Sequence, residues 1–176
     1  MDWGIPECDK GIGKVILKPD SADLIDGVKV HAYPLWPDDR GYFAEIIRIG
    51  QGPAGYFDPA TTQVSCALSY PGTVKAFHIH MEQTDFWVPA MGMFQVALVD
   101  LRKESPTFGR KNTLYVGSLR PWHLIIPPGV GHGYKVIGVD PAMLVYVTDK
   151  NYNPKDEGRI PYNDPGINYD WETQHK

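Results

Sequence analysis

The sequence predicts an all-β domain of the jelly-roll or barrel type. Its 18 Gly and 16 Pro are spread along the whole of its 176 residues and punctuate it at short intervals. Between them lie short runs rich in β-branched and aromatic residues, and no stretch carries the long 3.6-residue apolar stripe of an extended helix. Many short strands joined by tight turns are typical of an antiparallel sandwich or barrel.

The strand candidates follow one another along the chain without an internal repeat or a linker. The clearest are residues 73–80, 93–101, 122–126, 134–138 and 143–148. Residues 42–49 are the one stretch that allows a short helix, and we expect few helices in all. Proline-rich turns near both ends of the chain indicate edge segments, because proline cannot donate a hydrogen bond within a sheet.

Charge and hydropathy exclude several classes of protein. The net charge is −4, and no basic block offers the positive face that a nucleic acid requires. The apolar runs are far shorter than the roughly 20 residues needed to cross a bilayer, and the N-terminus lacks the layout of a signal peptide. Cys8 and Cys66 make neither a disulfide framework nor a paired-thiol zinc motif. We expect a cytoplasmic protein with no nucleic-acid and no membrane partner.

The spacing of three histidines and one aspartate indicates a candidate metal site. His78 and His80 point to the same face of a predicted strand, because strand side chains alternate. Asp85 follows five residues later, and a Pro-Pro-Gly-Val-Gly-His segment ends at His132. This arrangement resembles the two sequence motifs of metal-binding cupins. Three imidazoles and one carboxylate suit a divalent transition metal such as Fe, Mn, Ni or Zn, with positions left open for substrate.

Two positions depart from the cupin pattern. Asp85 stands where the acid is usually Glu, which shortens its reach by one methylene, and Val136 stands where the second motif usually closes with Asn. An incidental His-x-His pair is therefore the alternative to a metal site.

A second resemblance covers the chain from about residue 15 to Trp171. Its segments occur in register at residues 39–45, 99–109, 126–134, 146–154 and 163–171. Together they resemble the dTDP-4-dehydrorhamnose 3,5-epimerase family, whose fold is a cupin-type double-stranded β-helix, or jelly roll. The resemblance implies a single cupin domain over residues 1–176 and a homodimer in which the N-terminal segment pairs across the two subunits.

The reaction of that family requires a base and an acid on opposite faces of a 4-keto sugar. The carbons that flank the carbonyl carry acidic protons, so their inversion needs proton removal, enolate stabilisation and proton return. The resemblance assigns the base to His78 and the acid to Tyr146, and it implies no required cofactor. It also implies a set of substrate-binding residues, two of them contributed across the dimer. These are Gln63, Lys75, His132 and Tyr152, with Arg40 and Glu45 from the partner.

Several of these positions differ from the family pattern. Lys75 stands where the family has an Arg; it keeps the positive charge but cannot form the bidentate hydrogen bonds of a guanidinium group. Strict alternation places Lys75 on the opposite face of the strand from His78, so a role in the pocket requires a β-bulge. His80 replaces a Gln, and Asp85 aligns near the Lys that stabilises the enolate. The family's base is paired with an Asp in a C-terminal tail, and nothing after Glu172 resembles that tail.

Three functions remain open. The first, which the sequence favours, is an epimerase or isomerase of a nucleoside-diphosphate 4-keto-6-deoxyhexose. The second is a metal-dependent cupin isomerase or dioxygenase that uses His78, His80, Asp85 and His132. The third is a non-catalytic sugar- or metal-binding module. In the second, a nitrogen of His78 that binds metal cannot also remove a proton.

Overall fold

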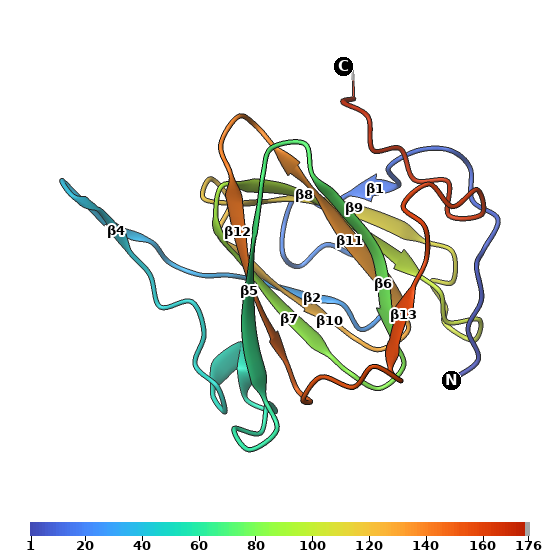
Figure 1. The fold of residues 1–176 in the computed structure, drawn as a ribbon, viewed down its shortest axis with the longest axis horizontal. Helices are drawn as coiled ribbons and strands as arrows, with labels where there is room; N and C mark the ends of the chain where they lie inside the picture. The colour runs from blue at the N-terminus through green and yellow to red at the C-terminus, as the bar shows by residue number, and fades with distance from the viewer. Residues whose placement is uncertain (175–176) are drawn as a thin grey trace.

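The computed structural model describes residues 1–174, and its regular structure consists almost entirely of β-strands (Figure 1). Within these residues one 3₁₀ turn, η1 (Gly52–Ala54), is the only helical element, and no helix has the length and hydropathy to span a bilayer. The strands are β1 (Lys14–Val15), β2 (Lys29–Ala32), β3 (Trp36–Asp38), β4 (Gly41–Phe43), β5 (Gln63–Ser69), β6 (Val74–His80), β7 (Asp85–Met91), β8 (Met93–Asp100), β9 (Lys111–Gly117), β10 (Trp122–Ile126), β11 (Val130–Ile137), β12 (Ala142–Thr148) and β13 (Glu157–Arg159).

Two sheets form the body of the molecule. One has six strands in the order β1-β9-β8-β11-β6-β13, and the other has five in the order β2-β10-β7-β12-β5. All neighbours in these sheets are antiparallel except β1 and β9. The expected jelly-roll architecture is confirmed.

Alternation along β8 shows how the sequence builds both faces of the six-stranded sheet. Phe94, Val96 and Leu98 enter the main core between the sheets. Ala97 and Val99 point to the other face. A strand buried on both faces is mostly apolar along its length, as β8 is apart from Gln95 and Asp100.

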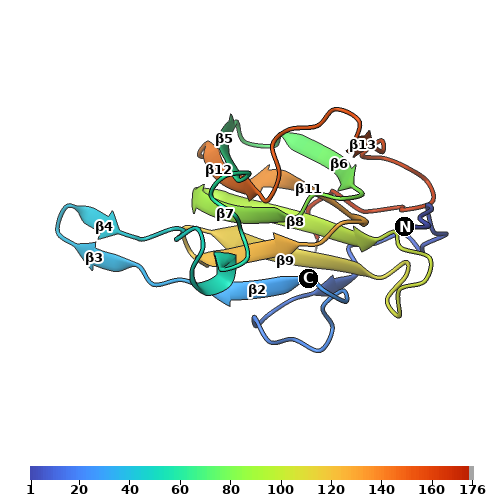
Figure 2. The ribbon, with the colours of Figure 1, turned by 90° about the horizontal axis from the view of Figure 1, so that it is seen from below.

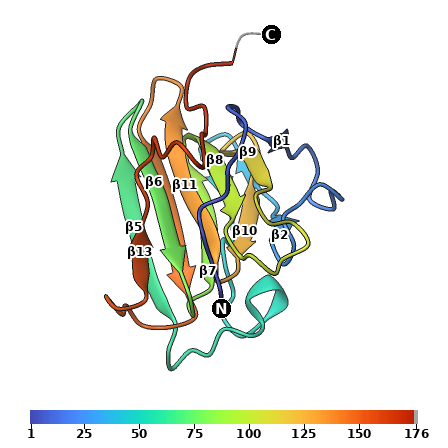
Figure 3. The same cartoon turned by 90° about the vertical axis from the view of Figure 1, so that its right-hand side faces the viewer.

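The outer face of each sheet is covered by chain that has little regular structure. The C-terminal segment packs Ile160, Ile167 and Trp171 against the outer face of the six-stranded sheet, and Figure 3 shows it running past β6 and β11. Ala54 and Phe57 cover the outer face of the five-stranded sheet in the same way. The main core and the pocket described below lie between the two sheets.

Strands β3 and β4 form a separate two-stranded hairpin that projects from the body (Figures 1 and 2). Trp36 on β3 lies opposite Phe43 on β4, and their ring centroids are 5.7 Å apart. Both side chains and that of Tyr42 are about half exposed or more. We call residues 36–43 the arm.

The predicted strands agree with the structure, and the predicted helix does not. Residues 73–80, 93–101, 122–126 and 143–148 match β6, β8, β10 and β12 to within one residue at each end, whereas 134–138 is only the second half of β11. The helix expected over residues 42–49 is wrong. Tyr42 and Phe43 pair with β3 in the arm, so tertiary pairing replaces the local helical preference.

Candidate active site

A pocket of about 390 Å³ opens between the two sheets, within the size range of small-molecule sites. Its walls come from different sheets. The side chains from β6, β11 and β13 are Lys75, His78, His80, His132, Tyr134, Glu157 and Arg159. Those from β5, β7 and β12 are Gln63, Ala67, Asp85, Trp87, Leu144, Tyr146 and Thr148. The loops after β6 and β12 add Gln83, Tyr152 and Asn153.

A β-bulge brings Lys75 into this pocket. His132 pairs with His78, and two residues later Tyr134 pairs with Lys75, so β6 contains one extra residue relative to β11. The extra residue reverses the alternation and places Lys75 on the same side as His78. Gly133 sits at the bulge, where a Cβ would lie 2.3 Å from that of Ala76, so the close approach of the strands requires glycine.

His78 faces a carboxylate on the neighbouring strand. Strand β13 runs antiparallel to β6, with Arg159 opposite His78 and Glu157 opposite His80. The diagonal neighbour Glu157 places Oε1 at 3.4 Å from Nδ1 of His78. Burial lowers the pKa of His78, as does the charge of His132, while Glu157 raises it; the net direction is downward. The imidazole is therefore favoured in its neutral form, which is the form that accepts a proton.

Glu157 is in turn held by two other side chains of the pocket rim. Arg159 donates to Oε1 from its Nε at 2.9 Å and from a terminal nitrogen at 2.8 Å. These hydrogen bonds hold the pKa of Glu157 below its usual value. A hydrogen bond to Glu157 raises the pKa of Tyr152, which keeps that phenol protonated.

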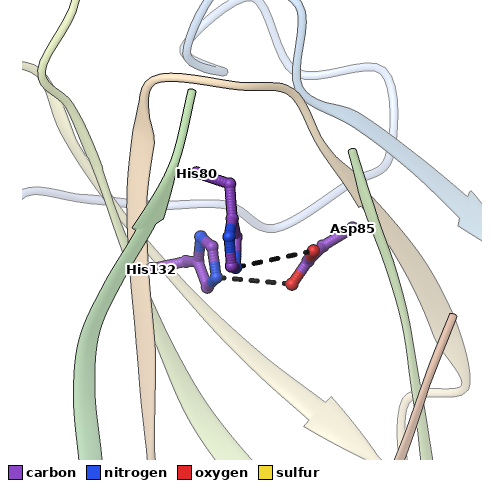
Figure 4. Close-up of side chains that lie close together, drawn as sticks. All are labelled: His80, Asp85 and His132. Atoms are coloured by element: carbon purple, nitrogen blue, oxygen red, sulfur yellow. Dashed lines mark ion pairs between the residues drawn. The ribbon is translucent and has the colours of Figure 1, made fainter. Parts of the chain in front are cut away.

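Deeper in the pocket, His80, Asp85 and His132 form a cluster that joins the two sheets (Figure 4). Oδ1 of Asp85 lies 4.0 Å from Nε2 of His80, and Oδ2 lies 3.4 Å from Nε2 of His132. Asp85 is 5% exposed. Burial raises the pKa of its carboxyl, and the hydrogen bond and charge of His132 together with the charge of His80 outweigh that effect, so the pKa is lowered. Among the described residues this is the group whose geometry could hold a metal ion, and it does not include His78.

Tyr146 occupies the opposite wall from His78. It lies on β12 between Ser65 of β5 and Trp87 of β7, and its partly buried ring packs against the main core. Gln63 lies two positions further along the same pair of strands, opposite Thr148, and its side-chain oxygen accepts a hydrogen bond from the backbone N–H of Tyr152.

Arg40 and Glu45 do not belong to this group. Arg40 lies at the exposed tip of the arm, where it pairs with Asp38. Glu45 pairs with Arg48 at 2.6 Å and lines a separate hollow near His123. Neither Arg40 nor Glu45 is among the described residues that line the pocket of their own chain.

Glu157, Arg159 and Gln83 are pocket residues that the sequence did not predict. Glu157 and Arg159 alternate along a strand of three residues, too short to give a periodic pattern. Gln83 donates from Nε2 to Oδ1 of Asp85 at 2.7 Å, and its place two residues before a candidate ligand is the one signal that marks it. Trp87 on β7 also donates from Nε1 to Oδ2 of Asp85, at 3.1 Å.

The fold and the pocket define a cupin-type β-sandwich with ionisable side chains on facing walls. A family model described as dTDP-4-dehydrorhamnose 3,5-epimerase matches residues 23–176. The spore coat polysaccharide biosynthesis protein SpsL of Bacillus subtilis (strain 168) is 43% identical over 155 residues, which cover 87% of this chain and 100% of SpsL.

Solved structures give the same result. A dTDP sugar isomerase from Desulfovibrio desulfuricans G20 superimposes with a TM-score of 0.76 at 26% identity, over 84% of this chain and 92% of that one. A dTDP-6-deoxy-D-glucose-3,5-epimerase from Legionella pneumophila, solved in complex with dTDP-4-keto-L-rhamnose, gives 0.73 at 26% identity, over 86% and 82%.

The chain belongs to the dTDP-4-dehydrorhamnose 3,5-epimerase family and is a nucleotide-sugar epimerase, so the expected family is confirmed.

Proposed function

We propose that this enzyme epimerises a nucleoside-diphosphate 4-keto-6-deoxyhexose by removing and returning protons on the carbons next to the C4 carbonyl. One observation carries the proposal: His78 and Tyr146 line the same pocket from opposite sheets. Inversion at carbon requires that the proton leave from one face of the sugar and return to the other. A base and an acid on facing walls satisfy that requirement.

His78 is the proposed base. Glu157 faces Nδ1 and favours the tautomer that carries its proton there, which leaves the lone pair on Nε2. In this role Glu157 is the carboxylate partner of the base. It positions the ring without contacting the reacting carbon.

Tyr146 is the proposed acid. Its phenol is a weak acid held on β12, and a proton delivered from that wall reaches the face opposite His78. The transfers use only side chains of the enzyme, so this scheme requires no cofactor.

The nucleotide part of the substrate is proposed to bind at the rim. Lys75 and Arg159 bring positive charge there, and Gln63 and Tyr152 offer hydrogen-bonding groups close to each other. The Legionella relative binds a dTDP sugar, and we extend that class of ligand to this chain. Cys8 and Cys66 are both free thiols, which is typical of a reducing compartment. The cytoplasmic location stays a prediction.

The arm supports the proposal of a homodimer. It exposes Trp36 and Phe43 at 51% and 68%, and it carries Arg40 away from the pocket of its own chain. Exposed aromatic side chains on a projecting hairpin are typical of a surface that a partner covers. We propose that the arm docks on a second copy, so that Arg40 at its tip and Glu45 in the segment that follows it reach the partner's pocket.

Proton exchange tests the proposal. The enzyme is incubated in heavy water with a dTDP-linked 4-keto-6-deoxyglucose, and deuterium at C3 and C5 is followed by NMR and mass spectrometry. Incorporation at either carbon by the wild type, lost in His78→Asn and kept in His31→Asn, supports catalysis. Tight binding of the nucleotide sugar without any exchange contradicts it and favours the non-catalytic module.

A further inference from the structure

The cluster of His80, Asp85 and His132 has a pattern of hydrogen bonds that the proton-transfer scheme does not use. Nδ1 of His132 lies 2.9 Å from the carbonyl oxygen of Val130. A carbonyl oxygen only accepts hydrogen bonds, so Nδ1 must carry the proton. Nε2 is the atom that faces Asp85. Metal-binding histidines typically donate their other ring N–H to a backbone carbonyl in this way.

Asp85 accepts hydrogen bonds from two uncharged side chains, Gln83 and Trp87. Gln83 donates to Oδ1 at 2.7 Å and Trp87 donates to Oδ2 at 3.1 Å. Neither donor carries a charge, so these two hydrogen bonds leave the negative charge of the buried carboxylate uncompensated. Uncharged donors to a carboxylate are typical of the surroundings of a metal ligand.

His80 completes the group. Its ring lies 5.6 Å from that of His132, its Nε2 faces Oδ1 of Asp85, and its Nδ1 is buried without a hydrogen-bond partner among the described residues. The three side chains offer ligand atoms that all lie within 4.8 Å of one another.

We propose that His80, Asp85 and His132 bind one divalent transition-metal ion at the inner end of the pocket. Ligand atoms about 2.0–2.2 Å from a shared ion lie at most about 4.4 Å apart. The separations of 4.0 and 3.4 Å, each to a different oxygen of Asp85, are within that limit, and the bound of 4.8 Å for all three ligand atoms is close to it. Two histidines and one carboxylate on one side of an ion leave its remaining positions open. Those positions face the pocket, since all three residues line it.

From the sequence, His78 is a candidate both for the base and for a metal ligand, and one nitrogen cannot do both. The proposed metal site does not need His78 as a ligand. That residue lies outside the cluster and faces Glu157, so a bound ion leaves its imidazole free. A bound ion would supply positive charge that polarises a carbonyl oxygen, at the position where the family has a Lys and this chain has Asp85. This consequence rests on the proposed function, whereas metal binding does not.

The competing arrangement is an Asp85–His132 ion pair held by a proton on Nε2 of His132. Metal content distinguishes the two. Untagged full-length protein is purified without chelator, and the metals are measured by inductively coupled plasma mass spectrometry before and after reconstitution with Fe²⁺, Mn²⁺, Ni²⁺ or Zn²⁺. We expect about one equivalent per chain, reduced at least tenfold in His80→Gln and Asp85→Asn. The same value should persist in His31→Gln and His78→Gln.

A Co²⁺-substituted sample gives a second readout that surface binding would not produce. Visible absorption bands of Co²⁺ bound by imidazole should appear in the wild type and disappear in His80→Gln, while the circular dichroism of that variant stays unchanged. Wild type without metal after each reconstitution, or equal metal content in all variants, overturns the proposal. Metal binding without proton exchange would instead contradict the proposed epimerase reaction and leave the metal site standing.

Discussion

Nδ1 of His78 lies 3.4 Å from Oε1 of Glu157, although the two residues are 79 positions apart in the chain. The contact exists because β13 adds to the edge of the six-stranded sheet beside β6. It gives the proposed base a carboxylate partner from within the folded domain.

Glu157→Gln tests this partnership. The amide keeps the shape of the side chain but loses the charge, and one of its atoms becomes a donor that cannot favour a proton on Nδ1. We expect kcat to fall about 10- to 100-fold, less than the roughly 10²- to 10⁴-fold that a general base itself contributes, because Glu157 only orients the base, with KM changed less than threefold. Steady-state kinetics on the 4-keto sugar nucleotide measures both.

Glu157→Asp is the matched variant. It restores the charge at a shorter reach, so it should recover part of kcat. A purely structural role predicts instead that both variants lose thermal stability and that kcat and KM change together.

His78→Asn removes the proposed base. Turnover and deuterium exchange should fall by about three or more orders of magnitude, while the affinity for the nucleoside diphosphate stays within threefold in isothermal titration calorimetry. An exchange rate within tenfold of wild type would rule out His78 as the base.

Tyr146→Phe removes the proposed acid without emptying its place beside Trp87. Exchange should slow more at one of C3 and C5 than at the other, because one wall of the pocket reaches the two carbons differently. NMR resolves the two positions in one experiment. Equal slowing at both carbons would indicate a packing role for the ring.

The sequence predicts strands well where local pattern and tertiary pairing agree, as in β6, β8, β10 and β12. It also identifies His78, His80, Asp85 and His132 as candidates, and the structure places all four around one pocket. Strand alternation alone places Lys75 on the wrong face, because the bulge opposite Gly133 depends on contact with β11.

The role of Glu157 could not be predicted either, because it also depends on how the strands pair. Its strand has only three residues, and its position beside His78 follows from sheet topology, which no local pattern encodes. The separation of His78 from the other three candidate ligands likewise depends on which side chains the opposite sheet presents, since Asp85 comes from β7.

The arm provides a test of the proposed dimer. The double variant Trp36→Ser/Phe43→Ser removes two exposed rings that contact each other outside the body of the fold. Light scattering after size exclusion should show a shift from dimer to monomer, with an unchanged thermal midpoint of the monomer body. Nucleotide affinity should fall about tenfold or more, as expected when a charge contact to phosphate is lost.

Arg40→Ala is the control for this experiment. It should weaken nucleotide binding while the protein stays dimeric, because Arg40 lies at the tip of the arm and not among its aromatic residues. A dimer that persists in the double variant would show that the arm does not hold the subunits together.

His123 makes stability depend on pH at a place remote from the pocket. Its ring is 6% exposed and stacks on Tyr33 with 4.4 Å between centroids. Burial, with a smaller effect from the neighbouring His31, lowers its pKa to about 4. Glu45 and Arg48 line the hollow beside it, so both signs of charge are near the ring.

Between about pH 6.5 and pH 4 the unfolded chain therefore binds a proton at His123 that the folded chain does not. The contribution to stability is complete above pH 6.5 and is lost as the pH falls towards 4, because protons then favour the unfolded state. His123→Phe keeps an aromatic ring beside Tyr33 and removes the titration. When the pH is lowered from 7.5 to 4.5, the free energy of unfolding measured with denaturant should fall by about 2–3 kcal/mol more in the wild type than in this variant. Parallel stability curves for the two proteins would show that His123 does not titrate differently on folding.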